Sequence, residues 1–207
     1  MVICWKAWDA RNREAHGEEG MRGRELWSWS KNYLDIFRSA STVPTILKNP
    51  PPRVHWIPPP DGTIKVNFDA ALPPSLPHYR VAMVARDFKG IAIWWSVDMF
   101  LGTVQAVEGE AHAALKAIQK SKTKGWASVI IEGDCRQLIS AIDDEDSTLC
   151  PIGAYVEDIR ALMLSFNSCQ FSFVPRNCNK LAHALANSIE LANLEGPILP
   201  LKVAHIA

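Results

Sequence analysis

The sequence predicts a mixed α/β domain built on a five-stranded sheet with helices on both faces, preceded by a helical N-terminal extension. Three segments with strand-like apolar patterns follow one another between residues 63 and 100, which favours three antiparallel strands. After residue 105, helical and strand-like segments alternate, which favours parallel pairing through right-handed crossovers. Together these two patterns predict three antiparallel strands followed by parallel strands in one sheet.

The three early strands are predicted over 63–69, 79–86 and 91–100. In the first, TIKVNFD, apolar and polar residues alternate, as in a strand with one buried face. Residues 87–90 separate the second and third strands and have the composition of a hairpin turn.

The later elements alternate in type, and apolar residues at helical spacing mark the first of them. They are a helix over 106–123, a strand over 128–132, helices over 136–142 and 152–165, a strand over 170–174 and a helix over 180–191. Ligands of such sheets bind near the carboxyl ends of the strands.

Three regions are predicted along the chain. Residues 1–60 form a Trp-rich helical extension, which contains Trp5, Trp8, Trp27 and Trp29, and a proline-rich linker that begins at Pro44. Residues 61–191 form the α/β domain. Residues 192–207 contain two prolines and are expected to be an irregular C-terminal tail.

The composition excludes some classes of protein. Hydrophobic residues make up 48% of the chain, which is enough for a packed core and argues against wholesale disorder. Lys+Arg and Asp+Glu both number 22. The zero net charge argues against binding to duplexes by charge alone, but it allows a local basic rim around an acidic centre.

The cysteines and the hydropathy indicate where the protein works. There are 5 cysteines without a CxxC pair, so neither a zinc ribbon nor a disulfide framework is supported and free thiols are expected. Charged residues begin at Lys6, too early for a secretory leader, and no apolar run is long enough for a membrane span. We therefore expect an intracellular protein, in the nucleus or the cytoplasm.

Three acidic residues come from separate elements that the predicted sheet brings together. Asp69 ends the first strand, Asp134 follows the fourth strand, and Glu110 lies near the start of the helix between them. Taken singly, Asp134 also fits a helix cap and Glu110 a helix-dipole partner. Carboxylates so close would repel one another unless a cation joined them, and oxygen ligands suit Mg²⁺ or Mn²⁺. Such a cluster can hydrolyse a phosphodiester between two bound ions.

Four stretches in this order resemble the ribonuclease H-like domain of plant non-LTR retrotransposon origin, the reverse-transcriptase-like group. They are WIPPPDGTIKVNFDAA at 56–71, VARD with Gly90 at 84–90, EAHAALKAI with IEGDC at 110–135, and VPRNCNKLAHALA at 174–186. The resemblance covers about residues 56–190. It implies a ribonuclease H-like fold for the α/β domain and a nucleic acid as its partner.

The resemblance also implies roles for individual residues. Asp69, Glu110 and Asp134 match the three metal-binding acids of ribonuclease H, and the fourth acid of the active enzymes falls at His183. Imidazole is a poor ligand for Mg²⁺, so His183 would instead contact a phosphate, transfer a proton, or simply complete its helix. Candidate phosphate contacts are Arg176, Asn179 and Lys180, or these residues simply form a solvated loop and helix start.

Two departures weaken the enzymatic interpretation. Residues 143–146 read DDED, where cellular relatives often have a basic protrusion, and this acidic stretch would repel a phosphate backbone. Ala70 replaces the glycine often found directly after the first acid.

The leading functional prediction is therefore a Mg²⁺- or Mn²⁺-dependent endonuclease that cuts the RNA strand of RNA–DNA hybrids, using Asp69, Glu110, Asp134 and His183. One alternative is a non-catalytic nucleic-acid-binding module derived from a retroelement. Another is a protein-interaction module that docks through its Trp-rich segment. The sequence does not identify protein partners, and it predicts no membrane partner.

Overall fold

The computed structural model describes residues 2–17, 21–41, 55–74, 76–144 and 151–206. The chain divides into two compact units, Met1–Pro52 and Arg53–Ala207. Most of the predicted proline-rich linker falls in residues 42–54, outside the described residues. No helix of the described parts is both long enough and apolar enough to span a membrane.

The N-terminal unit contains two helices, α1 (Val2–Ala15) and α2 (Gly23–Ser41). Between them, the ammonium of Lys6 lies 5.3 Å from the centre of the Trp29 ring, and Trp29 stacks on Tyr33 at 5.3 Å. Two other indoles remain in solvent, since Trp8 is 62% exposed and Trp27 is 68% exposed.

The larger unit is a mixed sheet with the strand order β5-β4-β1-β2-β3-β6. Its strands are β1 (Ile64–Ala71), β2 (His78–Arg86), β3 (Ala92–Leu101), β4 (Ser128–Gly133), β5 (Ser168–Phe173) and β6 (Leu194–Gly196). β1, β2, β3 and β6 pair antiparallel in succession, whereas β4 pairs parallel with both β1 and β5. The predicted mixed α/β class, with antiparallel strands followed by parallel ones, is confirmed.

The sheet has six strands rather than the five expected, because the C-terminal tail is not irregular. After the turn Ile189–Leu191, the tail forms β6 along the edge of β3 and then the one-turn helix α7 (Leu201–Ala204). The indole of Trp95 donates a hydrogen bond to the Ile198 carbonyl at 2.7 Å, which holds the tail on the sheet. A strand of three residues is too short to show a periodic pattern, so the sequence did not reveal it.

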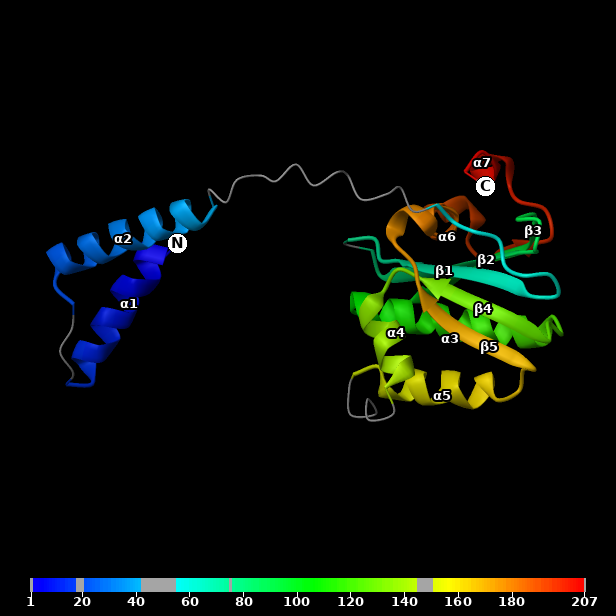
Figure 1. The fold of residues 1–207 in the computed structure, drawn as a ribbon, viewed down its shortest axis with the longest axis horizontal. Helices are drawn as coiled ribbons and strands as arrows, with labels where there is room; N and C mark the ends of the chain where they lie inside the picture. The colour runs from blue at the N-terminus through cyan, green and yellow to red at the C-terminus, as the bar shows by residue number, and fades with distance from the viewer. Residues whose placement is uncertain (1, 18–20, 42–54, 75, 145–150, 207) are drawn as a thin grey trace. The chain divides into compact units, whose positions relative to one another are not determined.

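Helices cover both faces of the sheet (Figure 1). On one face lie α3 (Ala106–Thr123), α4 (Arg136–Asp143) and α5 (Gly153–Met163), and on the other lies α6 (Lys180–Asn187), after the turn Arg176–Cys178. α6 ends four residues before the predicted helix, which stopped at residue 191.

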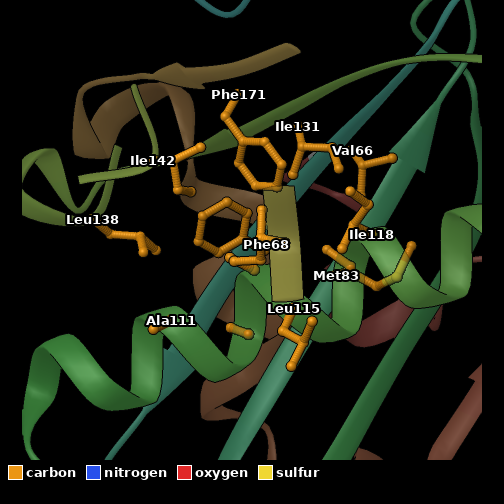
Figure 2. Close-up of a cluster of buried hydrophobic side chains, with 14 of the residues drawn as sticks. Val66, Phe68, Met83, Ala111, Leu115, Ile118, Ile131, Leu138, Ile142 and Phe171 are labelled. Atoms are coloured by element: carbon orange, nitrogen blue, oxygen red, sulfur yellow. The ribbon is translucent and has the colours of Figure 1, made fainter. Parts of the chain in front are cut away.

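The larger apolar core lies between the sheet and α3, α4 and α5, with Phe68 at its centre (Figure 2). Phe68 is fully buried, and its ring meets that of Phe171 edge-on at 6.5 Å. A Cβ atom at Gly133 would lie 2.3 Å from the Phe68 ring, so this position accepts only glycine. This close approach positions the end of β4 against β1.

The opposite face of β1 carries polar residues, because side chains alternate along a strand. Here Lys65, Asn67 and Glu132 form a buried ion network with Arg86 and Trp56. Lys65 Nζ lies 2.9 Å from Glu132 Oε1 and also donates to the Ile57 carbonyl. We use the name "buried ion network" below for these five residues.

Candidate metal centre

The three acidic residues singled out in the sequence lie together at the carboxyl ends of β1 and β4. Asp69, Glu110 and Asp134 each present one oxygen, and these atoms all lie within 4.8 Å of one another. β1 and β4 are parallel neighbours with Asn67 opposite Glu132, which brings Asp69 and Asp134 to adjacent positions two residues further along.

The N-terminal part of α3 brings Glu110, the fifth residue of the helix, to the same point. A Cβ atom at Gly109 would lie 3.0 Å from the Leu72 side chain and 3.3 Å from the Ala70 Cβ, so the helix start packs closely on the end of β1. The backbone N–H of Ala70 donates a hydrogen bond to Glu110. The residue that replaces the glycine after the first acid therefore helps to position the second.

Burial and repulsion from neighbouring carboxylates make the carboxyl groups of Glu110 and Asp69 hard to ionise. Burial, followed by the charges of Asp69 and Asp134, raises the pKa of Glu110 to about 8. Burial is also the largest cause that raises the pKa of Asp69 to about 6, opposed by its hydrogen bond with His183. Removing a carboxylate from water costs free energy unless a partner compensates its charge.

Within the described residues, two oxygens of the cluster have no such partner. Asp69 Oδ1 and Glu110 Oε2 are buried and accept no hydrogen bond, and the side chain of Asp69 is 0% exposed. Buried polar atoms without partners are rare in folded proteins and commonly indicate a missing ion or water. An all-oxygen site of this kind fits a hard divalent cation such as Mg²⁺ or Mn²⁺.

Asn179, at the start of α6, holds one of the acids in place. Its side-chain amide donates to the Phe68 carbonyl at 2.8 Å and to Asp134 Oδ1 at 3.2 Å. The sequence predicts Asn179 as a phosphate contact, but the residue is 0% exposed and cannot reach a phosphate. It instead ties the end of β1 to Asp134.

His183, from the next turn of α6, lies against the first acid. Its Nδ1 is 2.8 Å from Asp69 Oδ2, and because a carboxylate only accepts, Nδ1 carries the proton in this contact. Arg176 Nη2 lies 2.8 Å from the same Nδ1 and 3.1 Å from Nε2, and with Nδ1 donating to Asp69 only Nε2 of a neutral ring can accept from the guanidinium. Asn187, which the sequence did not single out, contacts the same ring at 3.1 Å from Nδ1.

Arg176 and Lys180 differ in their relation to the cluster. Arg176 Nη1 lies 3.0 Å from Asp134 Oδ2, and the arginine side chain is 61% exposed. Lys180 is exposed, and within the described chain no hydrogen bond or ion pair joins it to the acids. Of the acidic stretch 143–146, only Asp143 and Asp144 are described, and both are exposed.

A cavity of about 530 Å³ lies beside this centre, but none of the three acids lines it. Its lining is mainly apolar and comes from the loops before β2 and α3, namely Leu72, Pro73, Pro74, Leu76, Pro77, His78, Tyr79, Gly102, Thr103 and Val104.

Comparisons with known proteins agree with the fold of the larger unit. A family model described as reverse transcriptase-like matches residues 67–189. No curated protein sequence matches the chain.

Several solved structures share the fold at low sequence identity. RNase H1 from the halophilic archaeon Halobacterium salinarum NRC-1 is 21% identical, with a TM-score of 0.54 over 60% of this chain and 95% of that one. The N-terminal RNase H domain of rv2228c from Mycobacterium tuberculosis, solved as a fusion with maltose-binding protein, is 15% identical, with a TM-score of 0.55 over 60% and 91%. LC11-RNase H1 in complex with an RNA/DNA hybrid is 17% identical, with a TM-score of 0.54 over 60% and 94%.

Proposed function

This chain belongs to the reverse transcriptase-like family and has a ribonuclease H-like fold, and from that premise we propose that it is a divalent-metal-dependent endonuclease. Its proposed substrate is the RNA strand of RNA–DNA hybrids. The observation that carries the proposal is the acidic cluster, in which three carboxylate oxygens lie within 4.8 Å of one another. One structure with the same fold is a complex with an RNA/DNA hybrid, which supports the choice of substrate.

In the proposed mechanism, Asp69, Glu110 and Asp134 hold Mg²⁺ or Mn²⁺. Bound there, such an ion would supply Lewis-acid chemistry, polarising a phosphate and lowering the pKa of a water molecule. Asn179 keeps Asp134 oriented toward the ion through its buried hydrogen bond. The exposed guanidinium of Arg176 is placed to donate to phosphate oxygens, and we assign Lys180 a weaker role in contacting the nucleic-acid backbone.

The proposal extends to the origin and location of the protein. The four stretches at 56–71, 84–90, 110–135 and 174–186 favour descent from a plant retroelement. The odd cysteine count favours a reducing, intracellular compartment, either the nucleus or the cytoplasm.

Cleavage of a defined hybrid tests the function. We expect the purified full chain to cut the labelled RNA strand of a hybrid in Mg²⁺ and in Mn²⁺, since both ions suit an all-oxygen site. Asp69→Asn removes a ligand charge and should lower the rate by about 10³-fold or more. Double-stranded RNA, double-stranded DNA and single-stranded RNA serve as substrate controls, and equal cleavage of all four contradicts the substrate assignment.

A non-catalytic module is the second candidate, and two observations favour it. His183 stands where the active enzymes of the resembled family carry a fourth acid, and the N-terminal unit exposes the indoles of Trp8 and Trp27. A nucleic-acid-binding module would bind the hybrid with the same affinity in wild type and Asp69→Asn and would cleave it in neither. A protein-interaction module that docks through the exposed indoles would neither bind nor cleave the hybrid. Either result would overturn the nuclease proposal.

A further inference from the structure

We propose that the centre takes a single divalent cation and that the guanidinium of Arg176 supplies the second positive charge. This inference deepens the proposed function, since it assigns the charge that faces the scissile phosphate. It rests on an asymmetry between the two sides of the acidic cluster, one facing α3 and the other facing α6.

On the side of the cluster that faces α3, two carboxylate oxygens lack hydrogen-bond partners. Asp69 Oδ1 and Glu110 Oε2 are both buried, and neither has a hydrogen-bond partner within the described residues. One oxygen of each of these two acids lies within 4.8 Å of an oxygen of Asp134. A hard cation on this side would gain the two unpartnered oxygens of Asp69 and Glu110 as ligands, together with an oxygen of Asp134.

The side facing α6 is already occupied by protein groups. Arg176 Nη1 lies 3.0 Å from Asp134 Oδ2, and Arg176 Nη2 lies 2.8 Å from Nδ1 and 3.1 Å from Nε2 of the His183 ring. His183 Nδ1 lies 2.8 Å from Asp69 Oδ2. The guanidinium thus contacts Oδ2 of Asp134, and the imidazole contacts Oδ2 of Asp69.

A second divalent ion on this side would meet two obstacles. It would have to displace the Arg176 guanidinium from Asp134, and it would face the N–H of His183 in place of a carboxylate. Charge counting agrees, because one dication and one guanidinium neutralise the three carboxylates, whereas two dications would leave an excess of positive charge. Arg176 therefore takes the place of a second metal ion.

Arg176 is also free to turn toward a substrate. Its side chain is 61% exposed, whereas that of Asp134 is 8% exposed, so the guanidinium approaches the carboxylate from solvent and can turn back toward solvent. A guanidinium binds two phosphate oxygens at once through parallel N–H bonds. It can therefore exchange Asp134 for the scissile phosphate when a nucleic acid arrives.

Counting bound Mn²⁺ by electron paramagnetic resonance tests the inference without any nucleic acid. The wild-type full chain should bind one Mn²⁺ ion per chain. The double variant Arg176→Gln/His183→Asp removes the guanidinium and restores a carboxylate, and it should bind two. Two ions in the wild type, or one in the folded double variant, would overturn the proposal.

The single variant Arg176→Gln gives a second readout that a purely structural role would not move. Removing the competing cation should tighten the binding of the first Mn²⁺ about two- to fivefold, while hybrid cleavage should fall about 100-fold. Arg136→Gln is the matched control, since Arg136 is exposed and its guanidinium lies 4.0 Å from the Phe173 ring. It should leave both quantities unchanged.

These outcomes separate the two proposals. If no substrate is cleaved but the wild type binds one Mn²⁺ and the double variant two, the endonuclease function fails and the single-cation site stands. If the hybrid is cleaved and the wild type binds two ions, the endonuclease function stands and the single-cation site fails. An Arg176→Gln variant that loosens Mn²⁺ binding would also overturn the role given to Arg176.

Discussion

Two groups of charged residues lie on the same face of β1 and β4, one directly beyond the other. The buried ion network uses Asn67 and Glu132, and the metal centre uses Asp69 and Asp134, each two residues further along the chain. In the network, Glu132 accepts from Lys65, Asn67 and Trp56 at 2.9–3.2 Å. In the metal centre, two carboxylate oxygens accept no hydrogen bond from the part of the chain that the structure describes.

The difference shows how one structural pattern serves both stability and function. Arg86 remains positively charged in the network, since burial lowers its pKa only to about 10, and its guanidinium lies 3.5 Å from the Trp56 ring centre. The protein thus supplies its own cations for Glu132. For Asp69 and Glu110 it supplies too few, and the raised pKa values of both acids reflect that shortage. Carboxylates left without internal partners are the ones available to an external cation.

The largest loss of stability should come from removing the charge of Glu132. Glu132→Gln leaves the Lys65 ammonium buried and unpaired and turns an amide donor toward other donors, so the free energy of unfolding should fall by about 3 kcal/mol. Urea denaturation measures this. Glu195→Gln, which breaks the half-exposed pair with Lys120, is the control and should cost less than about 1 kcal/mol. Equal losses in both variants would contradict the comparison.

Removing a charge from the metal centre should instead raise the free energy of unfolding. The pKa of Glu110 is about 8 in the folded chain, above its ordinary value of 4.5. The folded state therefore retains a proton that the unfolded state releases, and stability falls as the pH rises from about 4.5 to 8. Without metal, Glu110→Gln should be more stable than wild type by roughly 2 kcal/mol near pH 9 and equal to it near pH 4.

Thermal unfolding across this pH range checks the prediction for Glu110. Saturating Mn²⁺ should stabilise the wild type and leave Glu110→Gln nearly unchanged, since the variant lacks one ligand charge. A difference between the two proteins that does not change with pH would show that repacking, not ionisation, is responsible.

A smaller effect is expected where a neutral residue supports the centre. Asn179→Ala removes the donor that orients Asp134, and residues that orient metal ligands typically contribute 10–100-fold to affinity, so Mn²⁺ binding should weaken about tenfold. Isothermal titration calorimetry measures the affinity. Asn187→Ala, which contacts only His183 at this centre, should change it less than about twofold. Similar losses in both variants would remove the distinction between them.

The smallest effect should come from one donor of the buried ion network. Trp56→Phe keeps an aromatic ring over Arg86 but loses the N–H that donates to Glu132 at 3.1 Å, and this should cost about 1 kcal/mol of stability. Urea denaturation of the full chain measures it beside Trp27→Phe, which alters an exposed indole and should change nothing. A Trp56→Phe variant with altered Mn²⁺ stoichiometry would show that network and metal centre are coupled.

The sequence predicted the elements that carry a long periodic pattern and missed those that do not. The alternation in β1 and the helical spacing in α3 extend over eight and eighteen residues, and both elements lie where they were expected. β6 has three residues and depends on two contacts with β3. The Trp95 indole of β3 donates to the Ile198 carbonyl, and the Asn193 side chain accepts from the Met99 N–H of β3. Short edge strands are determined by such long-range contacts, which leave no local pattern.

The three acids were identified from the sequence alone, because strand ends and a helix start are local features and parallel strands bring their ends together. The roles of the residues around these acids could not be predicted from the sequence. Asn179 and Arg176 lie three residues apart in similar polar sequence, yet one is buried beneath Asp134 and the other reaches over it from solvent. Which side chain is buried, and which carboxylate finds an internal cation, depends on segments more than forty residues apart. Only tertiary packing decides these contacts, since burial and charge compensation are properties of the assembled fold.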